Sequence, residues 1–184
     1  MCENDLDALR STCERAVEWA DVIELRLDCL DQTPQGFSEL IQHLTRPVIL
    51  TLRPSEQGGL RKLGREERVS FWSSIAPRGE NVWWDVEGDL VQDLTPDWSR
   101  VIVSHHDFSR VPTDLDQIYE RLSHSPAVVI KIAVQANTIL DCIPVFQLLD
   151  RAHSAGRQLI AIAMGNAGIA TRVLGPSRCS FLTY

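Results

Sequence analysis

The sequence predicts an α/β fold in which parallel strands alternate with helices in the manner of a (β/α)8 barrel. Short runs rich in β-branched and apolar residues alternate with longer amphipathic segments along the whole chain. This order is typical of a parallel sheet, because a crossover must separate each strand from its parallel neighbour. Charged residues that recur at every second position of the strands favour a barrel with a polar interior.

Seven strands are expected, covering residues 22–28, 47–53, 81–87, 100–107, 127–134, 159–165 and 179–184. Helical patterns are expected between them at about residues 36–44, 65–76, 113–123, 138–154 and 167–174, with one more at 4–19. A barrel helix normally follows a strand, so the helix at 4–19 suggests a barrel that lacks its first strand, of which only Met1 and Cys2 remain. We likewise expect the barrel to lack its C-terminal helix. We expect a single barrel domain over residues 1–184, and its unpaired strand edges favour a homodimer.

Composition limits the classes of function. The chain has 184 residues, 44% of them hydrophobic, which suffices for one sizeable core. Its apolar runs fall far short of the roughly 20 residues of a membrane helix, and a net charge of −7 disfavours nucleic-acid binding, so neither partner is expected. The acidic, polar N-terminus does not resemble a signal peptide, which predicts a cytoplasmic location.

Five cysteines without CxxC spacing fit reduced thiols that pack in the core better than disulfides or a zinc site: Cys2, Cys13, Cys29, Cys142 and Cys179.

The polar residues of the expected strands sort onto one face. Glu24, Arg26 and Asp28 alternate with Ile23, Leu25 and Leu27. In a parallel barrel both faces of a strand are covered, so three charges on one face must line a polar cavity. The same alternation gives further candidates, most of them near the C-terminal strand ends where barrel enzymes place their active sites. These are Thr51 and Arg53, Asp85 and Glu87, Ser104 and His106, and Val129, Lys131 and Ala133.

Lys131 carries the most specific signal. It is one of only two lysines and stands within the apolar run 128–134. Burial disfavours the ammonium form, and a neutral amine can attack a carbonyl to form an imine. The alternative is a structural ion pair with Asp85 or Glu87.

His106 shares the face of Ser104, while the adjacent His105 points the other way. An imidazole there suits proton transfer near neutral pH, and the alternative is a core or capping histidine. Because the two histidines point to opposite faces, we expect no metal site between them.

Two glycine-bearing loops complete the pattern. Arg172 follows the loop 165–168, where it could bind a carboxylate through a bidentate contact, although the loop could also seat a phosphate and the arginine could simply be exposed. Gln57, Gly58 and Gly59 are typical of an active-site loop that lets backbone approach a ligand, or of an ordinary turn.

Together these residues resemble the type I 3-dehydroquinate dehydratase family, from about residue 20 to residue 184. The motifs are Ile23–Asp28 (IELRLD), Leu50–Arg53 (LTLR) followed by Gln57–Gly59 (QGG), Ser104–Phe108 (SHHDF), Ile130–Ala133 (IKIA), and Ala163–Met164 leading to Arg172. The resemblance implies a TIM-barrel lyase of the shikimate pathway, which serves aromatic amino acid biosynthesis.

The resemblance also implies a mechanism. Lys131 would form an imine with the C3 ketone of 3-dehydroquinate, which acidifies the adjacent C2 proton. His106 would remove that proton, protonate the departing hydroxyl and assist hydrolysis of the imine, giving 3-dehydroshikimate. The family needs no metal and no organic cofactor.

Binding roles follow from the same resemblance. Glu24 and Arg26 would bind ring hydroxyls, Arg53 would line the pocket and Arg172 would bind the substrate carboxylate. Met164 and Tyr184 would provide apolar walls of the pocket. Asp85 or Glu87 would contact Lys131 or His106 and orient it without touching the substrate.

The chain departs from the family in three places. Gln57 stands where the family usually has a glutamate, so the orientation of His106 would depend on Asp85 or Glu87. We also expect the first barrel strand to be missing. The family's closing loop, with its serine and Pro-Gly-Gln motif, would come about ten residues after Tyr184, which predicts weak activity because lids of this kind exclude water.

Three other functions fit parts of the pattern. A metal-dependent barrel hydrolase would use a carbamylated Lys131, although no strand carries an HxH motif. A catalytically silent domain would keep the fold and only bind a ligand or partner. Another Schiff-base aldolase would share the lysine, but the Glu24 and Arg26 face favours a hydroxylated carboxylate.

Overall fold

The computed structural model describes residues 1–30, 35–75 and 79–184. Within these ranges six strands alternate with helices in chain order, which confirms the predicted α/β class. The residues group into two compact units. The first unit comprises Met1–Val86 and Gln92–Pro96, and the second unit comprises Glu87–Val91 and Asp97–Tyr184.

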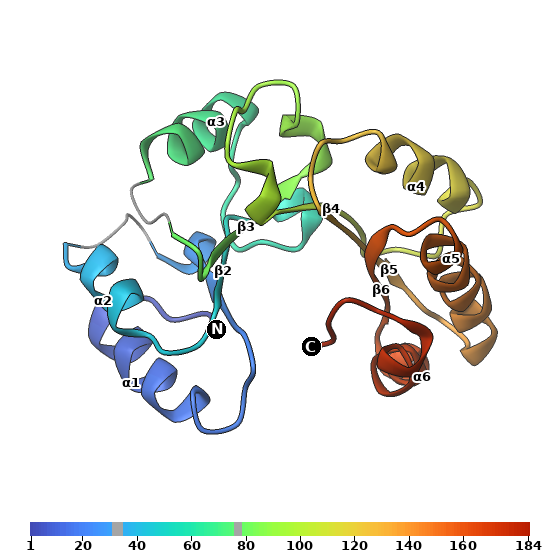
Figure 1. The fold of residues 1–184 in the computed structure, drawn as a ribbon, viewed down its shortest axis with the longest axis horizontal. Helices are drawn as coiled ribbons and strands as arrows, with labels where there is room; N and C mark the ends of the chain where they lie inside the picture. The colour runs from blue at the N-terminus through green and yellow to red at the C-terminus, as the bar shows by residue number, and fades with distance from the viewer. Residues whose placement is uncertain (31–34, 76–78) are drawn as a thin grey trace. The chain divides into compact units, whose positions relative to one another are not determined.

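The first unit is built on parallel strands that pair in chain order, with Arg26 beside Thr51 and Thr51 beside Asp85. Its elements are α1 (Leu6–Ala16), β1 (Ile23–Arg26), α2 (Phe37–His43), β2 (Val48–Thr51), α3 (Arg65–Ser74) and β3 (Val82–Glu87) (Figure 1).

The sequence of α1 explains where this helix begins and which side of it is buried. Asp5 caps it, because its carboxylate accepts a hydrogen bond of 2.8 Å from the backbone N–H of Ala8. Leu9 and Cys13, one helical turn apart, are buried on its inner side.

The N-terminal segment lies along the edge of β1. The backbone N–H of Arg26 donates to the carbonyl of Met1 at 2.8 Å, and the Met1 amino group donates to the carbonyl of Glu24. This pairing brings Cys2 beside Cys29, and the two form a disulfide with a Cα–Cα distance of 5.4 Å. The expectation of reduced thiols was therefore wrong for this pair, because the contact depends on backbone pairing that cysteine spacing does not show.

The other three cysteines are free thiols. Cys13 and Cys142 are buried, as expected of packing residues, whereas Cys179 is exposed. Burial raises the pKa of both buried thiols.

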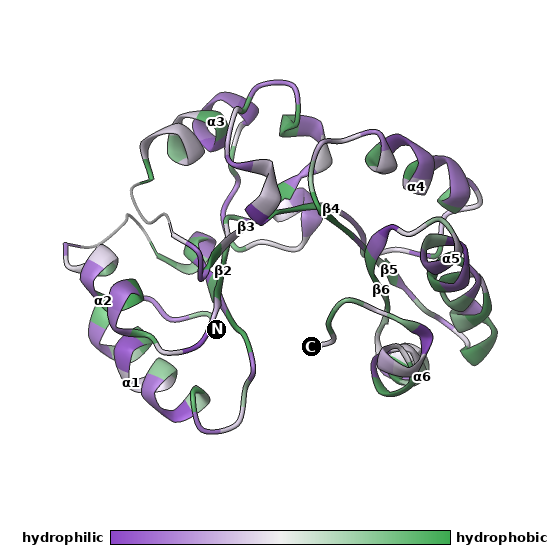
Figure 2. Ribbon diagram, in the orientation of Figure 1, coloured by the Kyte–Doolittle hydropathy of each residue, from purple (hydrophilic) through white to green (hydrophobic). Residues whose placement is uncertain are grey.

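The second unit repeats the parallel arrangement with longer strands. Its elements are β4 (Val101–Asp107), α4 (Leu115–Ser123), β5 (Val129–Gln135), α5 (Cys142–Ser154), β6 (Gln158–Met164) and α6 (Ile169–Leu174). Helices α4 and α5 cover one face of these strands, while the C-terminal end of the chain reaches the other (Figure 1). Figure 2 shows that the strands of this unit are mostly hydrophobic, whereas its helices carry both kinds of residue.

The seventh strand, expected at residues 179–184, does not form. Cys179 adopts a left-handed conformation with φ 62°, and the N–H of Ser180 bonds back to the carbonyl of Gly175. One backbone bond then joins the segment to the sheet, from the N–H of Phe181 to the carbonyl of Leu159 at 2.8 Å. The turn that ends α6 diverts the chain from β6 before a ladder can form.

Closure into an eight-stranded barrel and a single domain over residues 1–184 both stay predictions. In the ranges that the structure describes, no helix is both long and apolar enough to cross a membrane.

Candidate functional site

The strands of the first unit place its predicted site residues on one face. Arg26 pairs in register with Thr51 and Thr51 with Asp85. Residues paired across a parallel sheet point to the same side, and Glu24 and Arg53 follow by the two-residue period. The predicted alternation thus brings these side chains together.

Arg26 forms a bidentate ion pair with Asp28. Its Nε and Nη2 donate to the two carboxylate oxygens at 2.8 and 2.7 Å, and Nη2 also donates to the carbonyl of Gly58 at 3.2 Å. The hydrogen bond to Asp28 raises the pKa of the guanidinium. The half-buried Arg26 is therefore a fixed cation with a defined orientation.

Asp28 is the centre of this group, although strand β1 ends two residues before it. Its carboxylate is 1% exposed and also accepts from the backbone N–H groups of Arg53 at 3.3 Å and Leu60 at 3.0 Å. Burial raises the pKa of Asp28, but the bonds from Arg26, Leu60 and Arg53 outweigh burial, so the pKa lies below its ordinary value. Asp28 thus ties the loop after β2 to the end of β1.

Two further pairs complete the face. Arg53 Nη2 lies 2.8 Å from Asp85 Oδ1, with both side chains almost fully buried. The hydroxyl of Thr51 donates to Glu24 Oε1 at 2.6 Å. Asp85, which the sequence offered as a support for Lys131 or His106, is therefore engaged by Arg53.

The loop with Gln57 requires both of its glycines. Gly58 has a φ of 83°, and a Cβ on Gly59 would lie 1.8 Å from the carbonyl oxygen of Arg53. Gln57 ends the short 3₁₀ helix Ser55–Gln57 and is half-buried. The glycines place the loop backbone directly against the end of β2.

In the second unit, Lys131 lies in the middle of β5 and is 5% exposed. Its Nζ donates a hydrogen bond of 2.8 Å to the hydroxyl of Tyr184 and lies 4.3 Å from the centroid of the Tyr184 ring. The family resemblance predicted that Tyr184 forms an apolar wall of the pocket, whereas in the structure its hydroxyl contacts the Lys131 amine.

The strand register puts the other candidates of this unit on the face of Lys131. Ser104 pairs with Lys131, and His106 lies two residues further along β4, on the same side. Gln135 pairs with Met164, which brings the methionine to the same face near the strand ends. His106, Lys131 and Met164 therefore share one surface of the sheet, which the alternation predicts for His106 and Lys131.

The two adjacent histidines differ in surroundings. Burial and then the charge of Arg121 lower the pKa of His105. The ring of His106 instead stacks near Phe108, with centroids 6.2 Å apart. His105 thus belongs with helix α4, and His106 with the face of Lys131.

Glu87 and Arg172 are the remaining candidates of this unit. Glu87, the last residue of β3, belongs to the second unit although the rest of that strand belongs to the first, and it is fully buried. Arg172 is half-buried in α6, and its carbonyl accepts a bond of 3.1 Å from the Thr183 hydroxyl. The predicted role of Arg172 as a carboxylate ligand stays a prediction.

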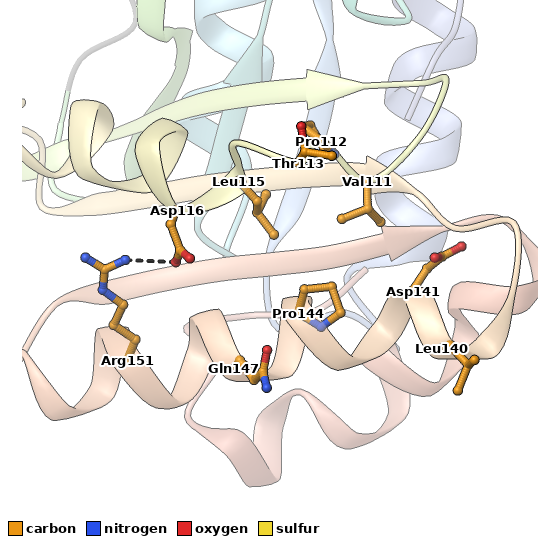
Figure 3. A pocket seen from close by; sticks show the side chains of 10 residues that line it. All are labelled: Val111, Pro112, Thr113, Leu115, Asp116, Leu140, Asp141, Pro144, Gln147 and Arg151. Atoms are coloured by element: carbon orange, nitrogen blue, oxygen red, sulfur yellow. Dashed lines mark hydrogen bonds and ion pairs between the residues drawn. The ribbon is translucent and has the colours of Figure 1, made fainter.

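A pocket of about 490 Å³ lies between α4 and the start of α5 (Figure 3). Val111, Leu115 and Pro144 give it apolar walls, and the ion pair of Asp116 with Arg151, 2.8 Å long, closes one end. No predicted site residue lines it. Among the residues with described positions, no group of three or more His, Cys, Asp or Glu could hold a metal ion.

Sequence reasoning underrated two groups. Asp28 was assigned only to a charged face, although its position two residues after Arg26 was a signal for a local ion pair. The Tyr184 hydroxyl had no signal, because the strand expected at residues 179–184 does not form and irregular backbone brings Tyr184 to Lys131.

Comparison with known proteins assigns the family. The family model described as Type I 3-dehydroquinase matches residues 1–184. The chain belongs to this family. Proteins named 3-dehydroquinate dehydratase from Desulfotalea psychrophila and Dehalococcoides mccartyi are each 31% identical over 175 residues, covering 90% and 91% of this chain and 76% of each relative.

Solved structures of the same name share the fold. The type I 3-dehydroquinate dehydratase of Clostridium difficile, with covalently modified comenic acid, has a TM-score of 0.81 at 22% identity, covering 96% of this chain and 78% of that one. The 3-dehydroquinate dehydratase of Aquifex aeolicus has a TM-score of 0.75 at 26% identity, covering 97% and 85%. The strand and helix order is thus that of type I dehydroquinases.

Proposed function

We propose that this chain dehydrates 3-dehydroquinate to 3-dehydroshikimate, a step of the shikimate pathway, through an imine on Lys131. Family membership supports dehydratase activity, and one observation supports the imine. Lys131 is a buried lysine on a strand face that also carries His106 and Met164. A buried amine is the nucleophile that imine formation requires.

The second unit would then provide the chemistry. Lys131 forms the imine with the C3 ketone, and the imine draws electrons from C2, so that its proton becomes acidic. His106 takes that proton and returns it to the departing hydroxyl, which leaves as water. Met164 and the ring of Tyr184 give the substrate ring apolar walls, and Glu87 supports the lysine or the histidine.

Charged and hydroxyl-binding groups would orient the substrate. Arg26 is held by Asp28, and Glu24 by Thr51, so these groups bind ring hydroxyls without first being ordered. Arg53 lines the pocket and Arg172 binds the substrate carboxylate. Gln57, in place of the family's glutamate, supports the site without adding a charge.

The proposal extends to three properties of the whole protein. It needs no metal or organic cofactor, because the imine itself is the electron sink. We also propose a homodimer and a cytoplasmic location. A reducing compartment would keep Cys2 and Cys29 as thiols, so intact mass measured without reductant, which shows whether their disulfide forms, tests this part.

The imine is tested by trapping. Wild-type protein with 3-dehydroquinate and borohydride should gain one covalent adduct on the peptide that contains Lys131, and Lys131→Ala should give neither adduct nor turnover. Lys62→Ala is the matched control, because it removes the other lysine and should leave adduct and rate unchanged. An adduct on Lys62, or turnover by Lys131→Ala, would overturn the proposal.

A further inference from the structure

The contact between Lys131 and Tyr184 is not explained by an apolar wall. The Tyr184 hydroxyl accepts a hydrogen bond of 2.8 Å from Lys131 Nζ. A phenylalanine would fill the same space and keep the contact of the amine with the ring, whose centroid lies 4.3 Å away. The hydroxyl therefore adds a donor and acceptor at the reactive nitrogen.

The chain after α6 holds this hydroxyl in place. The N–H of Phe181 bonds to the carbonyl of Leu159 on β6 at 2.8 Å, and the Thr183 hydroxyl bonds to the carbonyl of Arg172 at 3.1 Å. These anchors lie one and three residues before Tyr184. They direct its side chain onto the face of β5 that carries Lys131.

Lys131 and Tyr184 differ in accessibility. Lys131 is 5% exposed, whereas Tyr184 is 45% exposed. The hydroxyl thus contacts the buried amine while its side chain remains open to an arriving ligand.

We propose that the Tyr184 hydroxyl relays protons between Lys131 and the substrate oxygen while the imine forms and hydrolyses. This inference rests on the proposed function, and it assigns to Tyr184 a catalytic role in the steps at C3.

The relay conserves protons and electrons. The lone pair of the neutral Lys131 amine forms the N–C3 bond, and the carbonyl π pair moves onto the substrate oxygen. Tyr184 gives its hydroxyl proton to that oxygen and takes a proton from the attacking nitrogen, so that the tyrosine is unchanged and a neutral carbinolamine results. Direct transfer from nitrogen to oxygen would need a strained ring, which the intervening hydroxyl avoids.

The following steps use the same group. Tyr184 donates its proton to the carbinolamine hydroxyl, which leaves as water while the nitrogen lone pair forms the C=N bond. The tyrosinate then regains a proton from solvent. Hydrolysis of the product imine reverses this order, and His106 assists it. His106 also remains responsible for the C2 proton and for the hydroxyl eliminated from the ring.

Tyr184→Phe is the decisive variant, because it removes one oxygen and keeps the ring. Rapid mixing with 3-dehydroquinate, quenching with borohydride and intact mass measure the rate of imine formation. We expect this rate to fall by about 100-fold, within the range for a positioned acid or base. Binding of substrate, measured on the Lys131→Ala background, should not change.

Tyr119→Phe is the matched control. It removes the hydroxyl of the other tyrosine, which is buried in α4, and should leave the rate of imine formation unchanged. Circular dichroism of both variants verifies that they fold.

The outcomes separate this inference from the proposed function. If the wild-type protein forms no adduct, the proposed function fails and the relay fails with it. If wild-type and Tyr184→Phe proteins form the adduct at the same rate, the relay is wrong and the dehydratase mechanism stands. Tyr184→Ala weakening substrate binding while Tyr184→Phe reacts normally would return Tyr184 to the role of an apolar wall.

Discussion

In the first unit, charged residues at the strand ends are paired with opposite charges of the same unit, whereas in the second unit a strand of apolar residues carries Lys131, whose amine contacts a tyrosine hydroxyl. Arg53 pairs with Asp85 and Arg26 with Asp28. Lys131 contacts Tyr184. Ion pairs fix the orientation of charges, whereas a hydroxyl can both donate and accept a proton at the amine.

The difference suggests a division between stability and chemistry. Removing one member of a buried ion pair leaves an uncompensated charge, so first-unit variants should lose folding free energy. Variants on the Lys131 face should instead lose rate while the protein stays folded. The following experiments test this division, beginning with the largest expected effect.

His106→Ala should slow dehydration by about 100- to 10,000-fold, because the proton at C2 loses its carrier. The imine should still form, so the fraction of protein trapped by borohydride at steady state should rise, and the midpoint of thermal unfolding should change little.

His105→Ala is the control, because that ring points to the opposite side of β4. An equal loss of rate in both variants would show that the histidines act through the structure of β4, and the division would fail for this strand.

Arg53→Met should lower the free energy of unfolding by about 3–5 kcal/mol, because it leaves the Asp85 carboxylate buried without its cation. Chemical denaturation measures the loss. Arg172→Met changes a half-buried arginine of the second unit and should cost no more than about 0.5 kcal/mol while weakening substrate binding.

The double variant Arg53→Met with Asp85→Leu sharpens the test. It removes both charges and should recover part of the lost stability. If Arg172→Met proves as destabilising as Arg53→Met, ion pairing does not distinguish the two units.

Cys2→Ser with Cys29→Ser should lower the free energy of unfolding by about 3–4 kcal/mol, the loop entropy expected for a crosslink across 27 residues. Cys179→Ser, which removes an exposed free thiol of the second unit, should leave stability unchanged. Unfolding that is identical with and without reductant would show that the disulfide does not contribute.

The sequence predicted the faces of the strands well, because side chains alternate with a period of two and parallel strands keep paired residues on one side. His106 and Lys131 came to one face for this reason. What it missed lies where the chain leaves a periodic element. The Cys2–Cys29 bond and the Lys131–Tyr184 contact join residues 27 and 53 positions apart through irregular segments, which periodicity does not describe.

Asp28→Asn should cause the smallest loss of folding free energy. This loss should depend most directly on the charge of the Asp28 carboxylate. The amide keeps much of the shape of the carboxylate, so the loss at pH 7 should be about 1–2 kcal/mol, the range for hydrogen bonds to a charged group.

The bonds from Arg26, Leu60 and Arg53 hold the pKa of Asp28 below its ordinary value in the folded state. A carboxyl with a lowered folded-state pKa binds more protons when unfolded, so its contribution is complete above the ordinary range, about pH 4, and is lost as the pH falls through the folded-state pKa. The stability curves of wild-type and Asp28→Asn proteins should therefore run parallel above about pH 5 and converge in acid. A difference between wild-type and Asp28→Asn that stays constant down to the acid transition would mean that Asp28 acts through shape and not through charge, and the first unit would lose the feature that sets it apart.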